Sequence, residues 1–317
     1  SGIGRFIRYI PEPVIEGFTI GIAIVIAISQ LKDLTGLVTM PLPAEFLPKV
    51  EGLWAARDTL NPAALALGSA SIAAILILRR ISPRFPWMVA VVALASMIAA
   101  WAMPDIETVS GRYGMLPSGL PSPTLPAIDT HLIWELLPAA FTIALLAGIE
   151  SLLSAIVADR MIGGAHRSSA ELIAQGGANL ASPLFGGLPA TGAIARTATN
   201  VNAGGRTPVA GMIHALVILA AMLVASRPAG ALALPALAGL LIVTAWSMSE
   251  PHRWRERMKL PRAELALLFL TAVLTVLVDL TIAIALGTAI GLALRFREKR
   301  APLGDWHTPQ SGPTDRE

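Results

Sequence analysis

A carboxylate in the middle of an apolar stretch is the first feature of chemical interest. Glu150 lies about midway along a run of mostly apolar residues, with hydroxyl groups close by on Ser151 and Ser154. A charge at membrane depth is costly and usually faces a cavity, a partner group or a bound cation. The serine oxygens at helical spacing favour such a functional role for Glu150. A carboxyl group that stays protonated and bonded to a neighbouring helix is the structural alternative.

A broken helix is the second feature, and it lies in residues 186–196, Gly-Gly-Leu-Pro-Ala-Thr-Gly-Ala-Ile-Ala-Arg. Irregular backbone at membrane depth is tolerated only inside protein or against a water-filled cavity. A short helix that restarts near Thr191 would have unpaired N–H groups, and such a terminus attracts anions. Arg196, about one turn further on, would add a full positive charge; alternatively, it snorkels to the cytoplasmic interface from a kinked helix. The unpaired N–H groups would belong to Gly192, Ala193 and Ile194.

Patterns typical of enzymes and metal sites are missing from the sequence. The five histidines show no ligand spacing, so we expect no metal site of the zinc type. No histidine shares a helix with Ser151 and Ser154, so we expect neither an enzyme nor a catalytic residue. Gly204 and Gly205 before Arg206 lack the Walker spacing and its lysine, and a tight turn is the simpler interpretation. We expect no cofactor, and the absence of cysteine excludes disulfides.

The elements that position these residues must be membrane helices. The 317 residues are 54% hydrophobic and only 14% charged, with a mean hydropathy of +0.66, whereas soluble domains carry about 25% charged residues. Apolar blocks near bilayer-spanning length predict an all-α integral membrane protein. The pI of 9.7 does not indicate nucleic-acid binding, because the net charge is only +3 and the basic residues lie at the ends of apolar blocks.

Apolar runs predict ten helical segments. The last run, 263–296, holds 34 residues, and as one helix it would be about 51 Å long against a hydrocarbon core of about 30 Å. We therefore divide it at Asp279. The stretch 191–200 is too short to span and is predicted to be a half-helix. The predicted segments are 14–30, 61–79, 86–103, 133–158, 168–185, 191–200, 207–225, 232–248, 263–278 and 280–296.

The distribution of Lys and Arg predicts the orientation. With a cytoplasmic N-terminus, eighteen of the 24 basic residues fall in cytoplasmic loops and tails and five fall outside, as expected of cytoplasmic loops. The division at Asp279 keeps the basic clusters 253–262 and 295–300 on one side. Both termini are predicted to be cytoplasmic, and loops 31–60 and 104–132 to lie outside. We expect a multi-pass protein of a bacterial inner membrane.

Several runs of residues resemble one family. They are Ala158-Asp159-Arg160 through the run from Ser168 to Asn179, the run from Gly186 to Thr197, the run from Asn202 to Gly211, the opening Tyr9 to Thr19, and Gln30 to Asp33. Together they are similar to the SulP family of sulfate permeases and related anion transporters. The resemblance extends over nearly all of the chain to about residue 296, and the block 158–211 is its most specific part.

The resemblance implies a fold of fourteen segments in two inverted repeats of seven, each with a core part of four and a gate part of three. Two half-helices, the third and the tenth segments, would point at a substrate between core and gate. This chain would match segments five to fourteen, so we expect a fragment without the first four segments and without a STAS domain. The implied parts are 1–103 (gate of the first repeat), 104–132 (extracellular or periplasmic loop), 133–227 (core of the second repeat), 228–296 (gate of the second repeat) and 297–317 (cytoplasmic tail).

The resemblance also implies site roles. Thr191, Gly192, Ala193 and Ile194 would contact the anion, with Arg196 supplying a positive charge. Glu150, with Ser151 and Ser154, matches an acidic position that holds sodium in some relatives and a proton in others. This chain has Glu where a sodium-coupled bicarbonate carrier has Asp, so sodium coupling, proton coupling and uncoupled exchange all stay open.

The leading hypothesis is a secondary active transporter of small anions (sulfate, bicarbonate or a carboxylate), in which the core moves against the gate. A nucleobase permease of the same fold and a non-transporting membrane motor or scaffold are the alternatives. The expected partners are the anion, sodium or a proton, and the lipid bilayer, with no nucleic acid; a homodimer is an open option. One arginine beside a helix end does not identify the anion.

Overall fold

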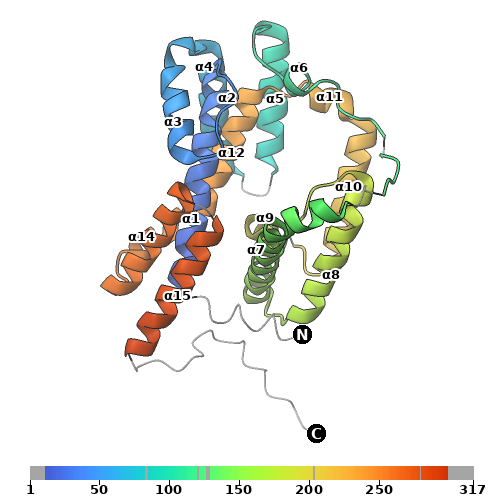
Figure 1. Cartoon of the computed structure of the whole chain (residues 1–317). Coiled ribbons are helices and arrows are strands. Elements are labelled where there is room, and N and C mark those ends of the chain that lie inside the picture. The colour runs from blue at the N-terminus through green and yellow to red at the C-terminus, as the bar shows by residue number, and fades with distance from the viewer. Residues whose placement is uncertain are drawn as a thin grey trace. The chain divides into compact units, whose positions relative to one another are not determined.

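The computed structural model describes residues 11–82, 85–119, 121–125, 129–202, 204–278 and 280–298 (Figure 1). These residues are mostly helical, and the β-structure recorded among them is an isolated bridge between Thr108 and Ala233. Contacts divide the chain into two compact units. Unit 1 comprises residues 1–11, 120–216 and 288–317, and unit 2 comprises residues 12–119 and 217–287.

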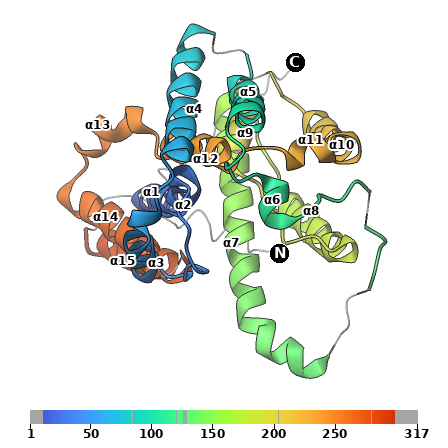
Figure 2. The same ribbon diagram turned by 90° about the horizontal axis from the view of Figure 1, so that it is seen from above.

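Unit 1 is built on one long helix, α7 (Thr130–Ile162), whose length is clear in Figure 2. Asp129 caps its start by accepting a hydrogen bond from the His131 N–H at 3.0 Å, and Gly163 ends it in the left-handed conformation that glycine adopts freely. The other helices of this unit are α8 (Ser168–Ala181), η3 (Ser182–Phe185), α9 (Ile194–Asn202), the first part of α10 (Pro208–Val224) and the last part of α15 (Leu280–Glu298).

Unit 2 holds longer apolar helices and several short connecting helices. Asn61 caps α4, because its side chain accepts hydrogen bonds from the N–H groups of Ala63 and Ala64. The helices of this unit are α1 (Glu12–Ser29), α2 (Leu31–Thr35), α3 (Phe46–Ala55), η2 (Arg57–Thr59), α4 (Pro62–Ile81), α5 (Trp87–Ala102), α6 (Val109–Tyr113), α11 (Ser226–Gly230), α12 (Leu234–Met248), η4 (Pro251–Arg253), α13 (Trp254–Arg257), α14 (Arg262–Leu277), the last part of α10 and the first part of α15.

Glycines allow the helices of unit 2 to pack closely. A Cβ atom on Gly17 of α1 would lie 2.3 Å from the Leu268 carbonyl oxygen of α14, and one on Gly21 would lie 2.5 Å from Cβ of Thr275. A Cβ on Gly239 of α12 would lie 2.9 Å from the Gly68 carbonyl oxygen of α4. Close approach at small residues is the usual way in which helices associate in lipid, where the hydrophobic effect offers little drive.

The ten predicted segments are all helical, with shifted ends. The predicted segment 168–185 is divided into α8 and η3, and the half-helix begins at Ile194 rather than near Thr191. The break predicted at Asp279 falls between α14 and α15, although Asp279 itself lies outside the described residues. Of the predicted tail 297–317, residues 299–317 also lie outside them.

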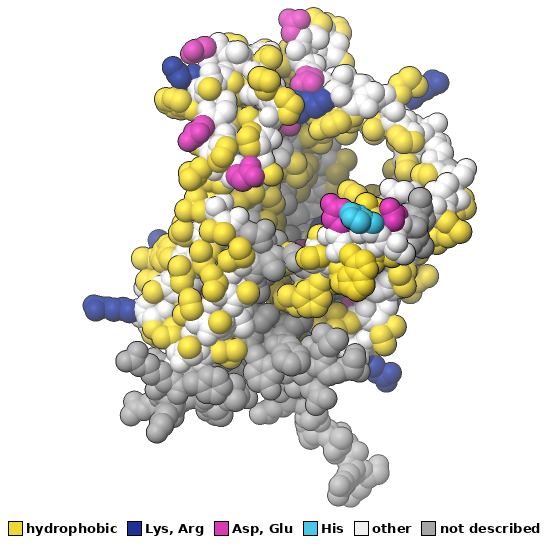
Figure 3. Space-filling view, in the orientation of Figure 1, with side chains coloured by type: hydrophobic (Ala, Val, Ile, Leu, Met, Phe, Trp, Pro, Cys, Tyr) yellow, Lys and Arg dark blue, Asp and Glu magenta, His cyan; other side chains and the backbone are white. Residues whose placement is uncertain are grey.

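The surface of the helices suits a lipid environment. Figure 3 shows hydrophobic side chains over much of the visible face, and α5 exposes Leu94, Met97 and Trp101, the last at 90%. Soluble monomers rarely expose such extended apolar patches. Three stretches of described helix are long and apolar enough to cross a membrane: Glu12–Thr35, Pro62–Ile81 and Thr130–Asp159.

Candidate functional site

The predicted helix break is present and is followed by a new helix N-terminus in unit 1. Gly186 ends η3 with φ of 69°, and residues 187–193 form no helix. The Thr197 N–H donates to the Ala193 carbonyl oxygen at 3.0 Å, which sets the first turn of α9. The helical N–H groups without a helical acceptor are therefore those at the start of α9. They belong to Ala193, Ile194, Ala195 and Arg196. The helix therefore starts at Ile194 rather than near Thr191, and Ala193 and Ile194 are common to the predicted and the observed sets of donors.

The residues before α9 lie against α7 where its serines are buried. The Thr191 hydroxyl donates to the Ala147 carbonyl oxygen at 3.0 Å. A Cβ atom on Gly192 would lie 3.3 Å from Oγ of Ser151, so only a residue of glycine's size leaves the present spacing undisturbed. Ser154, only 4% exposed, shares a 2.5 Å hydrogen bond with the Thr197 hydroxyl of α9. Residues of both predicted groups, those of 191–194 and the serines, thus come together.

The side chain of Ser151 points to α8 and reveals residues that the sequence did not single out. Ser151 is 1% exposed, and its hydroxyl lies 3.2 Å from Oε1 of Glu171 and 3.4 Å from Oε1 of Gln175. Asn179 follows on the same face of α8, one turn further along. The spacing of 171, 175 and 179 was the available signal, because residues four apart share a helix face.

Asn179 and Gln175 hold the unwound segment at Ala190. The Asn179 side-chain amide donates to the Ala190 carbonyl oxygen at 2.9 Å and accepts from the Ala190 N–H at 2.7 Å. The Gln175 amide donates to the same carbonyl oxygen. The Ser182 hydroxyl donates to the Leu188 carbonyl oxygen at 2.9 Å. Side chains of α8 and η3 therefore replace the backbone partners that this segment lacks.

Glu150 is half-buried on α7, one turn before Ser154. Helical spacing puts these two residues on one face of α7, and Ser154 meets α9 there. In the described part of the chain, the Glu150 carboxyl group makes no hydrogen bond or ion pair. Among the described residues it is therefore an acidic group without a partner, in a helix long and apolar enough to cross a membrane and next to two buried hydroxyls.

Arg196 is the third residue of α9 and lies in its first turn. Its exposed guanidinium contacts the imidazole Nε2 of His214 on α10, a partner that the sequence did not indicate. A cation in the first turn opposes the helix dipole, which favours anions at that end. The combination of a basic residue with a helix N-terminus concentrates positive potential in one place.

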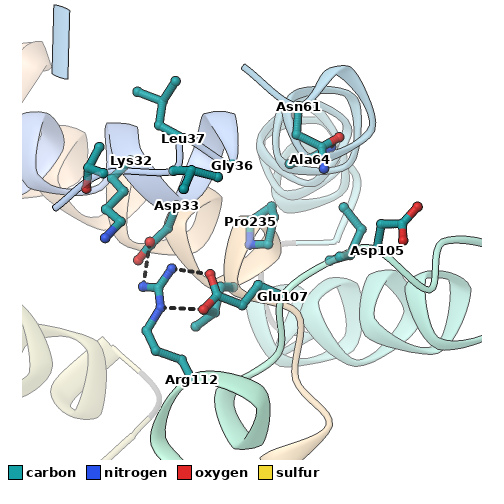
Figure 4. A pocket seen from close by; sticks show the side chains of 14 residues that line it. Lys32, Asp33, Gly36, Leu37, Asn61, Ala64, Asp105, Glu107, Arg112 and Pro235 are labelled. Carbon is teal, nitrogen blue, oxygen red and sulfur yellow. Dashed lines mark hydrogen bonds and ion pairs between the residues drawn. The ribbon is translucent and has the colours of Figure 1, made fainter. Parts of the chain in front are cut away.

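A separate polar cavity of about 370 Å³ lies in unit 2 (Figure 4). Arg112 of α6 bonds to Glu107 through Nε at 2.9 Å and to Asp33 of α2 through Nη1 at 2.6 Å. The hydrogen bond from Arg112 lowers the pKa of Glu107 against the effect of burial, with help from the charges of Arg112 and Lys32. Because both acids neutralise Arg112, this cluster joins α2 to α6 and leaves no free guanidinium for an anion. None of the predicted site residues lines this cavity.

A conventional metal centre is not formed by the described residues. They contain no group of three or more His, Cys, Asp or Glu side chains arranged to hold a metal ion. This search does not address a sodium ion held by one carboxylate with hydroxyl and carbonyl oxygens. The predicted residues that could supply such oxygens are Glu150, Ser151 and Ser154.

Comparisons with known proteins agree on one family. The profile of the Sulfate permease family matches residues 1–287. The putative sulfate transporter YvdB of Bacillus subtilis is 38% identical over 295 residues, which are 93% of this chain and 55% of that protein. The bicarbonate transporter BicA of Synechocystis is 29% identical over 290 residues, which are 91% of this chain and 50% of that protein. The chain thus spans about half the length of these curated relatives.

Solved structures support the same fold. The transmembrane domain of a cyanobacterial bicarbonate transporter BicA superposes with a TM-score of 0.76 at 29% identity, covering 88% of this chain and 70% of that one. The structure of SLC26A9 gives a TM-score of 0.77 at 22% identity, covering 91% and 47%, and shows likeness of fold alone. From the broken half-helix, the helical fold and the profile match together, it follows that the chain belongs to the sulfate permease family of membrane anion transporters.

Proposed function

We propose that the protein is a secondary transporter of a small anion (sulfate, bicarbonate or a carboxylate) in a bacterial inner membrane, and that the first turn of α9 binds this anion. The observation that carries the proposal is the coincidence of three features: unwound backbone before α9, N–H groups at its start, and Arg196 in its first turn. The N–H groups and the guanidinium all attract negative charge. An anion held there relieves the unfavourable placement of a cation at the positive end of a helix.

In this proposal, the face of α7 that meets α9 couples anion transport to a proton or sodium gradient. Glu150 is unpaired among the described residues, and Ser154 is bonded to Thr197 of α9. A proton on Glu150, or a sodium ion beside it, neutralises an acid that would otherwise repel the anion. Movement of α9 against α7 would then depend on both ligands, which is the basis for linking anion transport to a gradient.

Binding to the purified protein in lipid nanodiscs tests this proposal. Radiolabelled sulfate should bind saturably, and unlabelled bicarbonate should compete with it at the same site. Uracil, a neutral nucleobase, should neither bind nor compete, because it offers no negative charge to the first turn of α9. The absence of saturable anion binding would contradict the proposal, and saturable uracil binding would favour a nucleobase permease instead.

A further inference from the structure

The backbone between η3 and α9 has few partners of its own. Residues 187–193 are neither helix nor strand, and unpaired peptide groups are strongly disfavoured where water is excluded. Most of the side-chain bonds to this segment come from two neighbouring elements, α8 and η3, through Gln175, Asn179 and Ser182.

Asn179 differs from the other anchors because it binds both peptide groups of one residue. Its Nδ2 donates to the Ala190 carbonyl oxygen at 2.9 Å, and its Oδ1 accepts from the Ala190 N–H at 2.7 Å. A planar carboxamide carries a donor and an acceptor side by side, as a peptide group of a neighbouring strand does. Ser182 and Thr191 each make only one such bond. The Ser182 hydroxyl donates to the Leu188 carbonyl oxygen, and the Thr191 hydroxyl donates to the Ala147 carbonyl oxygen of α7.

We propose that Asn179 is a positioning residue for the anion site, and that its paired bonds to Ala190 set where the first turn of α9 lies. The inference rests on the proposed function of that turn. Only Thr191, Gly192 and Ala193 separate Ala190 from Ile194, so any loosening at Ala190 is transmitted to the N–H groups at the start of α9. A site that is ordered before binding avoids the entropy loss of ordering it during binding.

This role has a signature that distinguishes Asn179 from a charged ligand. Loosening the segment disperses all the N–H donors together, so every anion should lose affinity by the same factor whatever its charge. Arg196 interacts through its charge, so its removal should affect a divalent anion more than a monovalent one. The ratio of sulfate to bicarbonate affinity therefore separates positioning from direct attraction.

Asn179→Leu is the informative variant, because it keeps the approximate size of the side chain, adds no charge and removes both bonds to Ala190. Loss of these bonds should raise the Kd of sulfate and of bicarbonate equally, by about tenfold. Asn179→Gln, which retains donor and acceptor, should bind better than Asn179→Leu. Asn200→Leu on α9 is the control, because it makes the same substitution in unit 1 at a residue that makes no side-chain bond to residues 187–193.

A second measurement tests, without any anion, whether Asn179 holds the segment around Ala190 in place. The chain has no cysteine, so a nitroxide can be attached to Leu188→Cys, where the native side chain is 84% exposed. Asn179→Leu should increase the mobility of this label in the electron paramagnetic resonance spectrum, and Asn200→Leu should not. Unchanged mobility would overturn the inference.

Failure of the proposed function has a different outcome from failure of this inference. If the native protein binds no anion, the proposed function fails. The label at position 188 still reports whether Asn179 restrains residues 187–193. If the native protein binds anions and well-folded Asn179→Leu binds them equally well, the positioning role is overturned. A change in the sulfate to bicarbonate ratio in Asn179→Leu would also overturn it, because that result assigns Asn179 a charge-dependent role.

Discussion

Among the individual residues, Glu150 is the acidic residue of the proposed site and Arg196 is its basic residue. Arg196 lies in the first turn of α9, and Glu150 lies on the α7 face that carries Ser154, the partner of Thr197. A helix N-terminus favours negative charge and disfavours positive charge. Under the proposed function, a bound anion would explain the basic residue, and a cation or proton that accompanies the anion would explain the acidic residue.

Glu150→Gln should uncouple transport from its driving gradient. The glutamine keeps the size of the side chain but can neither take up a proton nor attract sodium. In the full-length protein, uptake of sulfate into proteoliposomes should lose its dependence on a proton or sodium gradient, while equilibrium binding of sulfate remains detectable. Glu135→Gln, at an exposed acid nearer the start of α7, should retain the gradient dependence. Full gradient-driven accumulation by Glu150→Gln would return this residue to a structural role.

The sequence singled out Glu150 and Arg196 but not the polar residues of α8. Glu150 and Arg196 stand out because charge is rare in apolar segments. Glu171, Gln175 and Asn179 lie in a less hydrophobic stretch, where polar residues are common, and their roles depend on what α8 packs against. Their spacing of four was visible, but the partner at Ala190 was not, because it is set by how the chain returns along α8.

At the level of helices, glycines determine how closely unit 2 packs. Gly17→Ala should destabilise the protein by about 1–3 kcal/mol, because the added methyl group would overlap the Leu268 carbonyl oxygen of α14. Gly176→Ala on α8 is the matched control, since no heavy atom lies within 4 Å of its added Cβ and alanine favours helix. Thermal unfolding in detergent, followed by tryptophan fluorescence, measures both. Equal melting temperatures would contradict the close approach of α1 and α14.

The cluster of Arg112, Glu107 and Asp33 should make stability depend on pH. The hydrogen bond from Arg112 lowers the pKa of Glu107 from its ordinary value of 4.5. A carboxyl group with a lowered pKa stabilises the fold above its unfolded pKa, and this contribution is lost as the pH falls through the folded pKa. The melting temperature of Glu107→Gln should therefore lie below that of the native protein at pH 7.

The difference between Glu107→Gln and the native protein should shrink as the pH falls below about 4.5. Glu51→Gln serves as the control, because Glu51 is exposed and makes no ion pair or side-chain hydrogen bond with any described residue. Its melting temperature should follow that of the native protein at every pH. A difference for Glu107→Gln that stays constant between pH 7 and pH 3 would show that ionisation of Glu107 does not stabilise the fold.

Helix positions followed from apolar runs, but the start of α9 did not. Two glycines and a proline predicted a break in the helix with a restart near Thr191, whereas the observed helix begins at Ile194. The Thr191 hydroxyl bonds to Ala147 of α7, and Ala190 is held by Asn179 of α8. These contacts with other helices keep the backbone unwound for longer, and no local pattern in the sequence reports them.

Across unit 2 as a whole, two ion-pair clusters follow the predicted topology. Residues predicted outside, such as Asp33, Glu107 and Arg112, meet at one end. The predicted cytoplasmic loop 249–262 meets the cytoplasmic end of the predicted segment 14–30, where the buried Arg257 donates to Glu16 at 3.1 Å and to the Ser249 carbonyl oxygen at 2.6 Å. The count of basic residues and the contacts therefore agree on which loops belong together, although the side of the membrane stays a prediction.

Labelling of single cysteines tests the predicted sides. Arg255→Cys lies in the basic cluster and Glu51→Cys in the loop predicted outside; both native side chains are exposed. An impermeant thiol reagent applied to intact cells should modify Glu51→Cys and leave Arg255→Cys unmodified until the membrane is opened. Labelling of both, or of Arg255→Cys alone, would contradict the predicted orientation.

The central claim, that the first turn of α9 binds an anion, is tested most directly by the anion affinities of Arg196→Ala. Coulomb attraction scales with the product of the charges, so the loss of binding free energy for divalent sulfate should be roughly twice that for monovalent bicarbonate. A fivefold loss for bicarbonate would then accompany a loss of about 25-fold for sulfate. Arg196→Lys should be intermediate, because it retains the charge without the planar fork. Equal losses, or none, in a well-folded Arg196→Ala protein would contradict a direct role for this turn.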